Sequence, residues 1–510
     1  MKVEEGGVVS RPNKVKTGPQ QMAALDLGSN SFHLLIAQES GGRVQVVDKH
    51  KEMVRLAEGL VEKGSLDPLV SNRALASLDR FSQRLRPLDN KNIRVVATSA
   101  FRQLGIQSKF FVDAESTLGH PIEVISGREE ARLIYLGVCH DLGDNSNRQL
   151  VVDIGGGSTE LIIGQNYTAK TLESVHMGCV SWAREYFPGD RVDAKRLRRA
   201  ISAAAVQLEP IAQNYLTRGW EYAIGASGTI NSVSAVQEAM GLGSGITLAS
   251  MKKIRDQILR AKSAYGLPGL SKERVEVFPA GLSILIAVFQ ILGIEKMDPA
   301  QTALREGVIY DLVGRKRRED VRDKTVSEVM RRFSVDELQS GRVKQTALNF
   351  LKKVKSEWNL RGSSNTALLG WGADLHEIGM DVSHSSYHRH GGYLLSNLEM
   401  PGFSKSEQLQ LATLVMLHRR KIRPEYFLDT SDNIIRLAVL LRLAALIHRG
   451  RNLKKTPEIV MRANFSRGQI TLEMGFKPDW LKNNPLTQLD LLEDAELLRE
   501  NRVLLRIVEI

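Results

Sequence analysis

The chain of 510 residues carries a formal net charge of +12, with 42% hydrophobic and 25% charged residues. This length exceeds one ordinary hydrophobic core, so about two to four domains are expected, and the composition excludes a fibrous or wholly disordered protein. The two cysteines, Cys139 and Cys179, exclude a disulfide framework and are typical of small buried side chains in a reducing cytosol. The basic charge favours a polyanionic partner, although a solvated basic surface would carry the same charge.

The N-terminal segment, residues 1–21, is polar and rich in Gly, Pro and Lys, which predicts a disordered tail rather than a signal peptide. The most apolar run, Leu282–Ile294, is shorter than a membrane span and predicts a buried helix. We therefore expect no transmembrane segment and a cytoplasmic protein. Its basic charge would allow peripheral attachment to an anionic membrane surface.

From Met22 to about Ile134 the pattern is rich in predicted strands. The stretch Ala23–Glu39, AALDLGSNSFHLLIAQE, predicts two strands joined by a tight polar turn. IRVVATSAFRQ, from Ile93 to Gln103, predicts another buried strand, and PIEVISG, from Pro121, a further one. A helix is expected to follow, at SGREEARLIYLGV.

The rest of the chain divides into three parts. A second α/β unit opens on LVVDIGGGSTELIIG, from Leu150 to Gly164, and includes a predicted strand, glycine turn and helix in YAIGASGTINSVSAVQEAM. The charge cluster Arg315–Asp320 predicts a domain boundary. Val321 to about Gly450 is expected to be helical, and short strands from Thr456 onward predict a small terminal α/β module.

The two strand-turn-strand units form an internal repeat, LDLGSNSFHLLI and VDIGGGSTELII, each with an aspartate (Asp26 or Asp153) ahead of small residues. Small residues let backbone N–H groups approach a phosphate closely, and hydroxyls add donors. An aspartate repels a bare phosphate, so it makes sense beside Mg²⁺ or a water that it orients. A single loop of this kind would be interpreted as an ordinary hairpin turn. The matched pair instead predicts two loops that hold a phosphate from both sides of a cleft.

Six motifs occur in the order DLGSNSF, VISGREEARLIYLGV, VVDIGGGSTELIIG, MGCVSW, GASGT and ALREG. Together they resemble the exopolyphosphatase and guanosine pentaphosphate phosphohydrolase family, within the actin, Hsp70 and sugar-kinase superfamily. The resemblance implies an α/β fold: two ribonuclease H-like, actin-type domains around a cleft, an all-helical HD-like domain and a small C-terminal α/β domain. It also implies a Mg²⁺-dependent phosphoanhydride hydrolase that forms a homodimer. The four expected domains are residues 22–134, 135–320, 321–452 and 453–510.

The start of the predicted helix holds the expected catalytic acid. Ser126 and Glu129 match the capping-box pattern S-x-x-E, which turns Glu129 back toward the helix N-terminus and leaves Glu130 free. By the resemblance, Glu130 occupies the position of the family's catalytic glutamate, a general base for water. Without the resemblance, two surface glutamates that open a helix would be the preferred interpretation.

The resemblance and the repeat also imply roles for other residues. Asp26 and Asp153 are expected to organise Mg²⁺ or the attacking water, with Glu160 as a weaker metal candidate. Arg102 and Arg55 are candidate phosphate clamps because a guanidinium can bind phosphate with two N–H groups, and a surface role is an equal alternative for both. The GASGT turn is expected to line the cleft or to bind a guanosine base. The two phosphate-binding loops comprise Gly28, Ser29, Asn30, Ser31 and Gly155, Gly156, Gly157, Ser158, Thr159.

The helical part contains a histidine-rich stretch, LHEIGMDVSHSSYHRH, that resembles the metal-binding core of HD-type phosphohydrolases. Glu377 follows His376 where that core has an aspartate, so the ligand set is degenerate. We expect these histidines to bind polyanion or to pack structurally rather than to hold a metal. The basic runs HRRKIR and HRGRNLKK favour a positively charged substrate path, whereas either run alone would be a solvated face.

We therefore expect an exopolyphosphatase that releases orthophosphate from the end of inorganic polyphosphate. Hydrolysis of guanosine pentaphosphate to the tetraphosphate is the close alternative, and no nucleic-acid partner is expected. A sugar-type kinase is less favoured because the chain has no recognisable sugar-acceptor segment, and a hydrolase alone would place label from ¹⁸O-water in the released phosphate. A non-catalytic polyanion-binding regulator would gain little from Asp26, Glu130 and Asp153 beside a phosphate.

Overall fold

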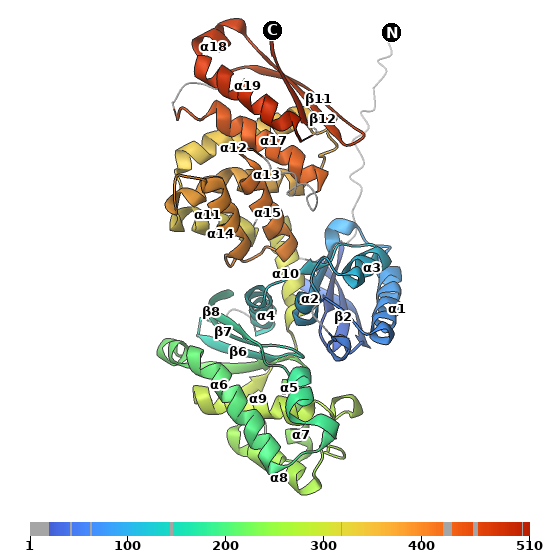
Figure 1. Cartoon of the computed structure of the whole chain (residues 1–510). Helices are drawn as coiled ribbons and strands as arrows, with labels where there is room; N and C mark the ends of the chain where they lie inside the picture. The colour runs from blue at the N-terminus through green and yellow to red at the C-terminus, as the bar shows by residue number, and fades with distance from the viewer. Residues whose placement is uncertain are drawn as a thin grey trace, which may run out of the picture. The chain divides into compact units, whose positions relative to one another are not determined.

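The computed structural model describes residues 20–40, 43–61, 64–142, 146–317, 319–421, 431–451, 457–501 and 503–510. The chain forms two compact units, which Figure 1 colours along the sequence. The first comprises residues up to Ile122 together with Glu130–Val313, and the second comprises Glu123–Glu129 with Gly314–Ile510. The predicted N-terminal tail lies outside the described residues up to position 19, and the predicted domain boundaries stay predictions.

The first lobe of unit 1 is a sheet covered by helices. Its strands β3, β2, β1 and β4 lie side by side in that order, with β1 antiparallel to β2 and parallel to β4. The strand β1 is buried along most of its length, as its apolar sequence AALDL predicts. The elements are β1 (Gln21–Leu27), β2 (Ser31–Ser40), β3 (Arg43–Met53), α1 (Pro68–Leu85), β4 (Ile93–Ala97), α2 (Ser99–Leu104) and α3 (Lys109–Leu118).

One predicted strand of this lobe is wrong in its second half. The expected strand Ile93–Gln103 ends at Ala97, and the helix α2 begins at Ser99. The backbone N–H of Arg102 donates to the carbonyl of Thr98 at 3.0 Å, which is a helical hydrogen bond. A short apolar run cannot by its periodicity distinguish a strand from a helix, and this turn places Arg102 on a helix.

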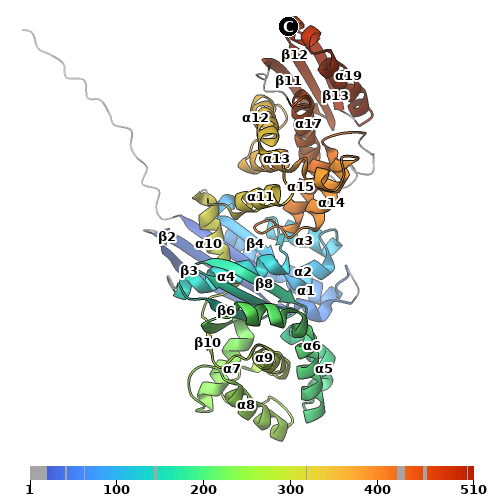
Figure 2. The ribbon, with the colours of Figure 1, turned by 90° about the vertical axis from the view of Figure 1, so that its left-hand side faces the viewer.

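The second lobe repeats the arrangement with a sheet in the order β10-β9-β6-β7-β8. The apolar run predicted as a buried helix is α9, buried along almost its whole length, and α6 packs against it (Figures 1 and 2). The strands are β6 (Gln149–Ile154), β7 (Thr159–Gln165), β8 (Thr168–Val175), β9 (Tyr222–Ala226) and β10 (Met297–Pro299). The helices are α4 (Gly127–Leu142), α5 (Cys179–Tyr186), α6 (Ala194–Arg218), α7 (Ser227–Ala239), α8 (Leu248–Ala261), α9 (Phe278–Leu292) and α10 (Leu304–Lys316).

Unit 2 confirms the expected helical region and the small terminal α/β module. A single apolar core runs from Val326 in α11 to Leu505 in β13, so the helices and the terminal sheet share one interior. Its sheet has the order β11-β12-β13. The elements are β5 (Glu123–Val124), α11 (Val321–Arg332), α12 (Glu337–Val354), α13 (Ser363–Leu375), α14 (Tyr387–Asn397), α15 (Lys405–Leu417), α17 (Asp432–Ile447), β11 (Ile459–Ser466), β12 (Gln469–Phe476), α18 (Pro478–Asn483), α19 (Pro485–Arg499) and β13 (Val503–Glu509).

Two further sequence expectations can be compared with the structure. Cys139 and Cys179 are free and buried, as expected of small apolar side chains. In the part of the chain that the structure describes, no helix is long and apolar enough to cross a membrane.

Candidate active site

The two repeats fold into the same hairpin. Asp26 in β1 lies opposite His33 in β2, and Asp153 in β6 lies opposite Glu160 in β7. Each turn is closed in the same way, because the N–H of its first glycine donates to the carbonyl of the serine three residues later. The distances are 3.2 Å from Gly28 to Ser31 and 2.9 Å from Gly155 to Ser158. The repeat read from the sequence is therefore a structural repeat.

The two loops approach each other within unit 1. A Cβ atom added to Gly156 would lie 3.0 Å from the Cβ of Ser29, and one added to Gly157 would lie 2.7 Å from the Oγ of Ser99. Gly178 packs still closer, since its added Cβ would lie 2.3 Å from the carbonyl carbon of Gly156. Larger residues at these positions would push the loops apart, so the glycines permit the close approach.

A cavity of about 300 Å³ lies between the loops. It brings together the three expected acids and most of both phosphate loops. The GASGT turn also contributes Ser227 and Gly228, as expected of a segment that lines the cleft. The predicted residues that line the cavity are Asp26, Gly28, Ser29, Asn30, Ser31, Glu130, Asp153, Gly155, Gly156, Gly157 and Ser158.

The acids of the cavity are buried and close enough to influence one another. Burial raises the pKa of Asp26 to about 7, with Glu130 and Asp153 adding to the shift and the Arg305 charge opposing it. Burial also raises the pKa of Asp153 to about 7. The Oδ1 atom of Asp26 is buried without a hydrogen-bond partner among the described protein groups. Such a carboxylate is suited to a cation or an ordered water.

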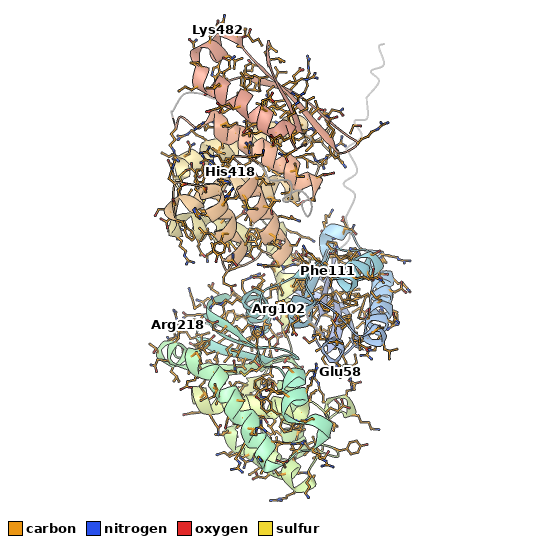
Figure 3. All side chains as sticks on the ribbon, in the orientation of Figure 1. Glu58, Arg102, Phe111, Arg218, His418 and Lys482 are labelled. Atoms are coloured by element: carbon orange, nitrogen blue, oxygen red, sulfur yellow. The ribbon has the colours of Figure 1, made fainter. Side chains whose placement is uncertain are left out.

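Glu130 is held by an arginine from the other lobe. Arg102 of α2, labelled in Figure 3, donates from Nη1 to Oε2 of Glu130 at 2.9 Å. Burial raises the pKa of Glu130 above its ordinary value, and the charge and hydrogen bond of Arg102 oppose that shift. Arg102 does not line the cavity, so its observed position supports orientation of Glu130. Its predicted role as a phosphate clamp stays a prediction.

The helix start that sets Glu130 contains one hydrogen bond of the expected cap. The N–H of Glu129 donates to the hydroxyl of Ser126 at 3.1 Å. The carboxylate of Glu129 accepts from the backbone N–H of Gly402 at 2.9 Å, both within unit 2. Adjacent glutamates on a helix point in directions about 100° apart, so Glu129 makes this contact while Glu130 faces the cavity.

Besides Arg102, three predicted residues lie away from the cavity lining. The Arg55 guanidinium donates to Glu276 at 3.1 Å, a position that does not favour a phosphate clamp. The hydroxyl of Thr159 donates to the carbonyl of Met177, and the carboxylate of Glu160 accepts from Ser174 at 2.8 Å. Burial raises the pKa of Glu160 well above its ordinary value. The roles proposed for these residues from the sequence stay predictions.

The cavity also contains basic groups that sequence reasoning did not assign to it. Lys51, Arg274 and Arg305 line it together with His33. Arg305 belongs to the ALREG motif, which the sequence analysis noted without a role. The guanidinium of Arg274 packs over Gly228, since an added Cβ there would lie 1.6 Å from its Nη2 atom. These groups place positive charge in the cavity, and guanidinium groups suit the oxygens of a phosphate.

The histidines of unit 2 have a structural arrangement. His376 and His418 end helices α13 and α15, and each donates from Nδ1 to the backbone carbonyl three residues earlier, Ala373 or Val415. Both line a cavity of about 430 Å³ that also contains Arg419 and other arginines. Across the described ranges, no three His, Cys, Asp or Glu side chains approach one another closely enough to hold a metal by themselves.

Comparisons with known proteins agree with this geometry. The model of the Ppx/GppA phosphatase family matches residues 35–316, and that of Ppx/GppA phosphatase domain III matches residues 321–495. The chain is 38% identical over 479 residues to a guanosine-5'-triphosphate,3'-diphosphate pyrophosphatase of Pseudoalteromonas translucida, covering 93% of this chain and 95% of the relative. A Vibrio cholerae protein of the same name is 38% identical over 477 residues, again covering 93% and 95%.

Solved structures share the fold of more than half of the chain. An exopolyphosphatase from Cytophaga hutchinsonii has a TM-score of 0.52 at 24% identity, covering 58% of this chain and 98% of its own. A Ppx/GppA family member from Aquifex aeolicus has a TM-score of 0.50 at 22% identity, covering 58% and 99%. Two actin-type lobes around a cavity with paired loops, and similarity along nearly the whole chain, lead to one conclusion: the chain belongs to the Ppx/GppA phosphatase family and is a phosphoanhydride hydrolase.

Proposed function

We propose that this protein hydrolyses the terminal phosphoanhydride bond in the 5'-triphosphate of guanosine 5'-triphosphate 3'-diphosphate, which is guanosine pentaphosphate. The reaction releases orthophosphate. The main support for hydrolysis is the cavity that Glu130 lines together with the two predicted phosphate-binding loops. The substrate follows from relatives at 38% identity over 93% of the chain, which carry this activity in their name. The expectation from the sequence put polyphosphate first, and these relatives favour the nucleotide instead.

The chain's own groups support an in-line hydrolysis. Glu130 accepts a proton from a water molecule, whose oxygen attacks the terminal phosphorus while the bond to the bridging oxygen breaks. Guanosine tetraphosphate is the leaving group. The loop N–H groups and the charges of Arg274 and Arg305 stabilise the phosphoryl oxygens. The buried position of Glu130 beside Arg102 holds the base in one orientation.

The acids also fit a divalent cation. Asp26 and Asp153 line the cavity with pKa values raised to about 7 by burial, so nearby positive charge would stabilise their ionised forms. Mg²⁺ keeps several water ligands and needs only about one or two protein carboxylates beside substrate phosphates. We propose that Asp26 and Asp153 hold Mg²⁺, which when bound would neutralise charge on the phosphate chain.

A comparative assay tests the substrate proposal. Purified protein with Mg²⁺ is given guanosine pentaphosphate, short polyphosphate and long polyphosphate separately, and orthophosphate release is measured in ¹⁸O-water. The highest kcat/KM is expected on guanosine pentaphosphate, with one labelled oxygen in the released phosphate. A higher kcat/KM on either polyphosphate would overturn the substrate proposal, and unlabelled phosphate would overturn hydrolysis by direct water attack.

Asp153→Asn is expected to weaken the response to Mg²⁺ more than the binding of substrate. An amide oxygen is a poorer ligand for a hard cation than a carboxylate. The measurement is a Mg²⁺ titration of activity, paired with a calorimetric titration of Mn²⁺ into the protein without substrate. Superimposable curves for the variant and the wild type would remove Asp153 from the metal site.

Polyphosphate remains a second candidate because unit 2 offers a basic surface. A cavity of about 760 Å³ there is lined by four basic residues and by no carboxylate. Among the described residues Arg419 and Arg420 have no carboxylate partner, and Arg419 stacks over the ring of Tyr387 at 4.3 Å. The four basic residues are Arg389, Arg419, Arg420 and Lys421.

The double change Arg419→Ala and Arg420→Ala is expected to weaken the binding of long polyphosphate. The binding of guanosine pentaphosphate should stay nearly the same. Affinity falls as the salt concentration rises. By analogy with single-stranded nucleic acid, each lost phosphate contact should make the plot of log affinity against log salt less steep by about 0.7. Arg449→Ala is the matched control, because Arg449 is already paired with Asp490. This variant should change the affinity for long polyphosphate less than the double change does. Equal losses on long and short substrates would exclude binding of a distant phosphate chain by these arginines.

A further inference from the structure

The first phosphate loop takes part in a hydrogen-bonded chain of three side chains, and the reaction above gives no role to two of them, His33 and the hydroxyl of Ser31. Arg305 Nη1 lies 3.0 Å from Nδ1 of His33, and Nε2 of His33 lies 2.7 Å from Oγ of Ser31. All three residues line the cavity. Ser31 and His33 stand on β2, two positions apart, and His33 faces the β1 position of Asp26.

The direction of these hydrogen bonds follows from the groups themselves. A guanidinium has donors and no acceptor, so Nδ1 of His33 must accept from Arg305. A neutral imidazole whose Nδ1 accepts carries its hydrogen on Nε2. This N–H therefore donates to the hydroxyl oxygen of Ser31. The hydroxyl must then direct its own hydrogen elsewhere, and within the described residues no protein acceptor for it is found.

We propose that His33, fixed by Arg305, is a positioning residue that holds the Ser31 hydroxyl as a hydrogen-bond donor toward a phosphate oxygen in the cavity. A free serine hydroxyl rotates and can present either its hydrogen or a lone pair, and a lone pair would repel phosphate. The two hydrogen bonds from Arg305 to His33 and from His33 to Ser31, called the relay below, fix the direction of the Ser31 hydroxyl before the substrate binds. The site then needs less reorganisation during the reaction. The inference rests on the proposed assignment of this cavity as the hydrolytic site.

The second repeat holds its serine from the same position. Glu160 takes the place of His33 opposite the aspartate, and its carboxyl group is hydrogen-bonded to Ser158. In both hairpins the side chain across from the aspartate thus holds the serine of the phosphate loop. In the first loop that side chain is a histidine, and the direction of its hydrogen bonds is set by an arginine.

A double-mutant cycle separates this role from simple packing. The kcat/KM for guanosine pentaphosphate with Mg²⁺ is measured for wild type, Ser31→Ala, His33→Leu and the double variant. A hydrogen bond to a charged group predicts a loss of about 10- to 100-fold for each single variant. The double variant should lose no more than Ser31→Ala alone, because His33 acts through Ser31. Additive losses, or a His33→Leu variant with wild-type activity, would overturn the proposal.

A conservative replacement and a direct observation complete the test. His33→Gln can place an amide N–H near the position of Nε2 and should recover most of the activity lost in His33→Leu. Equal losses in both would contradict the relay. If His33→Leu fails to fold by circular dichroism, ¹⁵N NMR of the wild-type ring decides: a hydrogen on Nε2 and none on Nδ1 is expected, and the opposite tautomer overturns the inference.

Failure of the inference can be distinguished from failure of the proposed function. Glu130→Gln is included in the same assay. If Glu130→Gln abolishes turnover while the His33 variants keep it, the relay alone is wrong. If Glu130→Gln keeps turnover, the cavity is not the hydrolytic site, and the NMR tautomer still tests the geometry of the relay.

Discussion

Glu130→Gln is expected to lower kcat by about 10²- to 10⁴-fold while substrate binding is retained, because a glutamine cannot accept the proton of the attacking water. The change keeps the size of the side chain and an oxygen that can accept from Arg102, so the cavity should hold its shape. The measurement is kcat by steady-state phosphate release, with binding of guanosine pentaphosphate measured separately by calorimetry. A parallel loss of binding and turnover would contradict a role as general base.

Glu129→Gln is the matched control for that variant. The two glutamates are adjacent at the start of the same helix, but the carboxylate of Glu129 accepts from the backbone N–H of Gly402 in unit 2. A glutamine oxygen can accept the same hydrogen bond, so turnover should stay near the wild-type value. A loss in Glu129→Gln equal to that in Glu130→Gln would show that charge near the helix start matters rather than one base.

The pH dependence of turnover has a defined sign. Glu130 serves as a base only when it is ionised, and burial raises its pKa above the ordinary value despite the opposing charge of Arg102. Activity should therefore fall as the pH is lowered through this raised pKa, at a higher pH than for an exposed glutamate. Bound Mg²⁺ would shift this limb toward lower pH, because a nearby positive charge favours the ionised form of Glu130.

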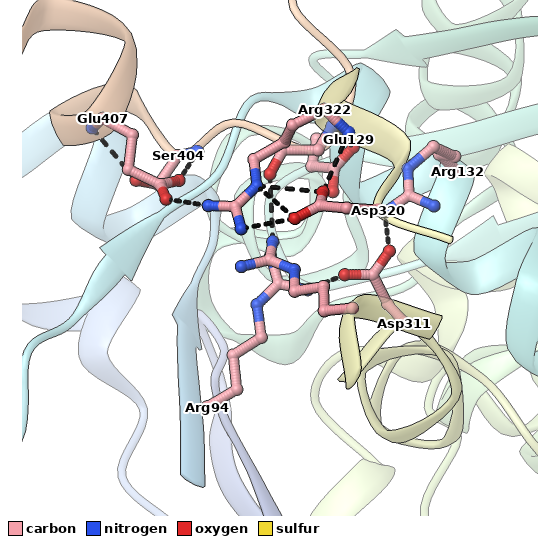
Figure 4. A network of polar contacts seen from close by, with 10 residues as sticks. Arg94, Glu129, Arg132, Asp311, Asp320, Arg322, Ser404 and Glu407 are labelled. Carbon is pink, nitrogen blue, oxygen red and sulfur yellow. Dashed lines mark hydrogen bonds and ion pairs between the residues drawn. The ribbon is translucent and has the colours of Figure 1, made fainter. Parts of the chain in front are cut away.

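Asp311→Ala is expected to destabilise unit 1 by about 3–5 kcal/mol, the cost of breaking a buried ion pair by removal of one partner. Asp311 of α10 accepts from Arg94 of β4 at 2.7 Å and from Arg132 of α4 at 2.6 Å, as Figure 4 shows. Arg94 and Asp311 are almost completely buried. The alanine would leave two guanidiniums without this carboxylate, and the side chain of Arg94 is almost completely buried.

The measurement is the free energy of unfolding from urea titration, followed by a signal from unit 1. Asp298→Ala is the matched control, because its partner Lys296 lies 3.3 Å away and both side chains are more than half exposed. Exposed pairs contribute only about 0–1 kcal/mol, so the control should barely change stability. Similar losses for the two aspartates would show that the pair at Asp311 is worth no more than a surface contact.

Part of the site could be predicted from the sequence because its information is local. The repeat LDLGSNSF and VDIGGGST specifies two hairpins through neighbouring residues, since glycine and small polar residues close the turn and apolar residues on either side form the strands. The placement of Glu130 follows in the same way from helical geometry one residue after Glu129. These residues line the cavity as expected, although their catalytic roles stay predictions.

Other parts of the site depend on contacts between distant segments. Arg305 lies 272 positions from His33, and no local pattern pairs them. Arg55 and Arg102 were equal candidates in the sequence, yet α2 turns Arg102 toward Glu130 while Arg55 lies beside Glu276. The apolar run from Ile93 could not decide between strand and helix at Ser99, because that choice depended on where the chain packs.

The sequence by itself determined the two glycine-containing hairpin turns, the buried helix α9 and the succession of α/β, helical and terminal α/β parts, because each depends on periodicity or on residues within one turn. Tertiary structure alone decided which distant side chains lie next to one another. Arg102 lies beside Glu130, Arg305 lies beside His33, and Asp311 lies between two arginines. The physical reason is that charges interact through space over distances that the fold sets, whereas the separation of residues along the chain says little about those distances.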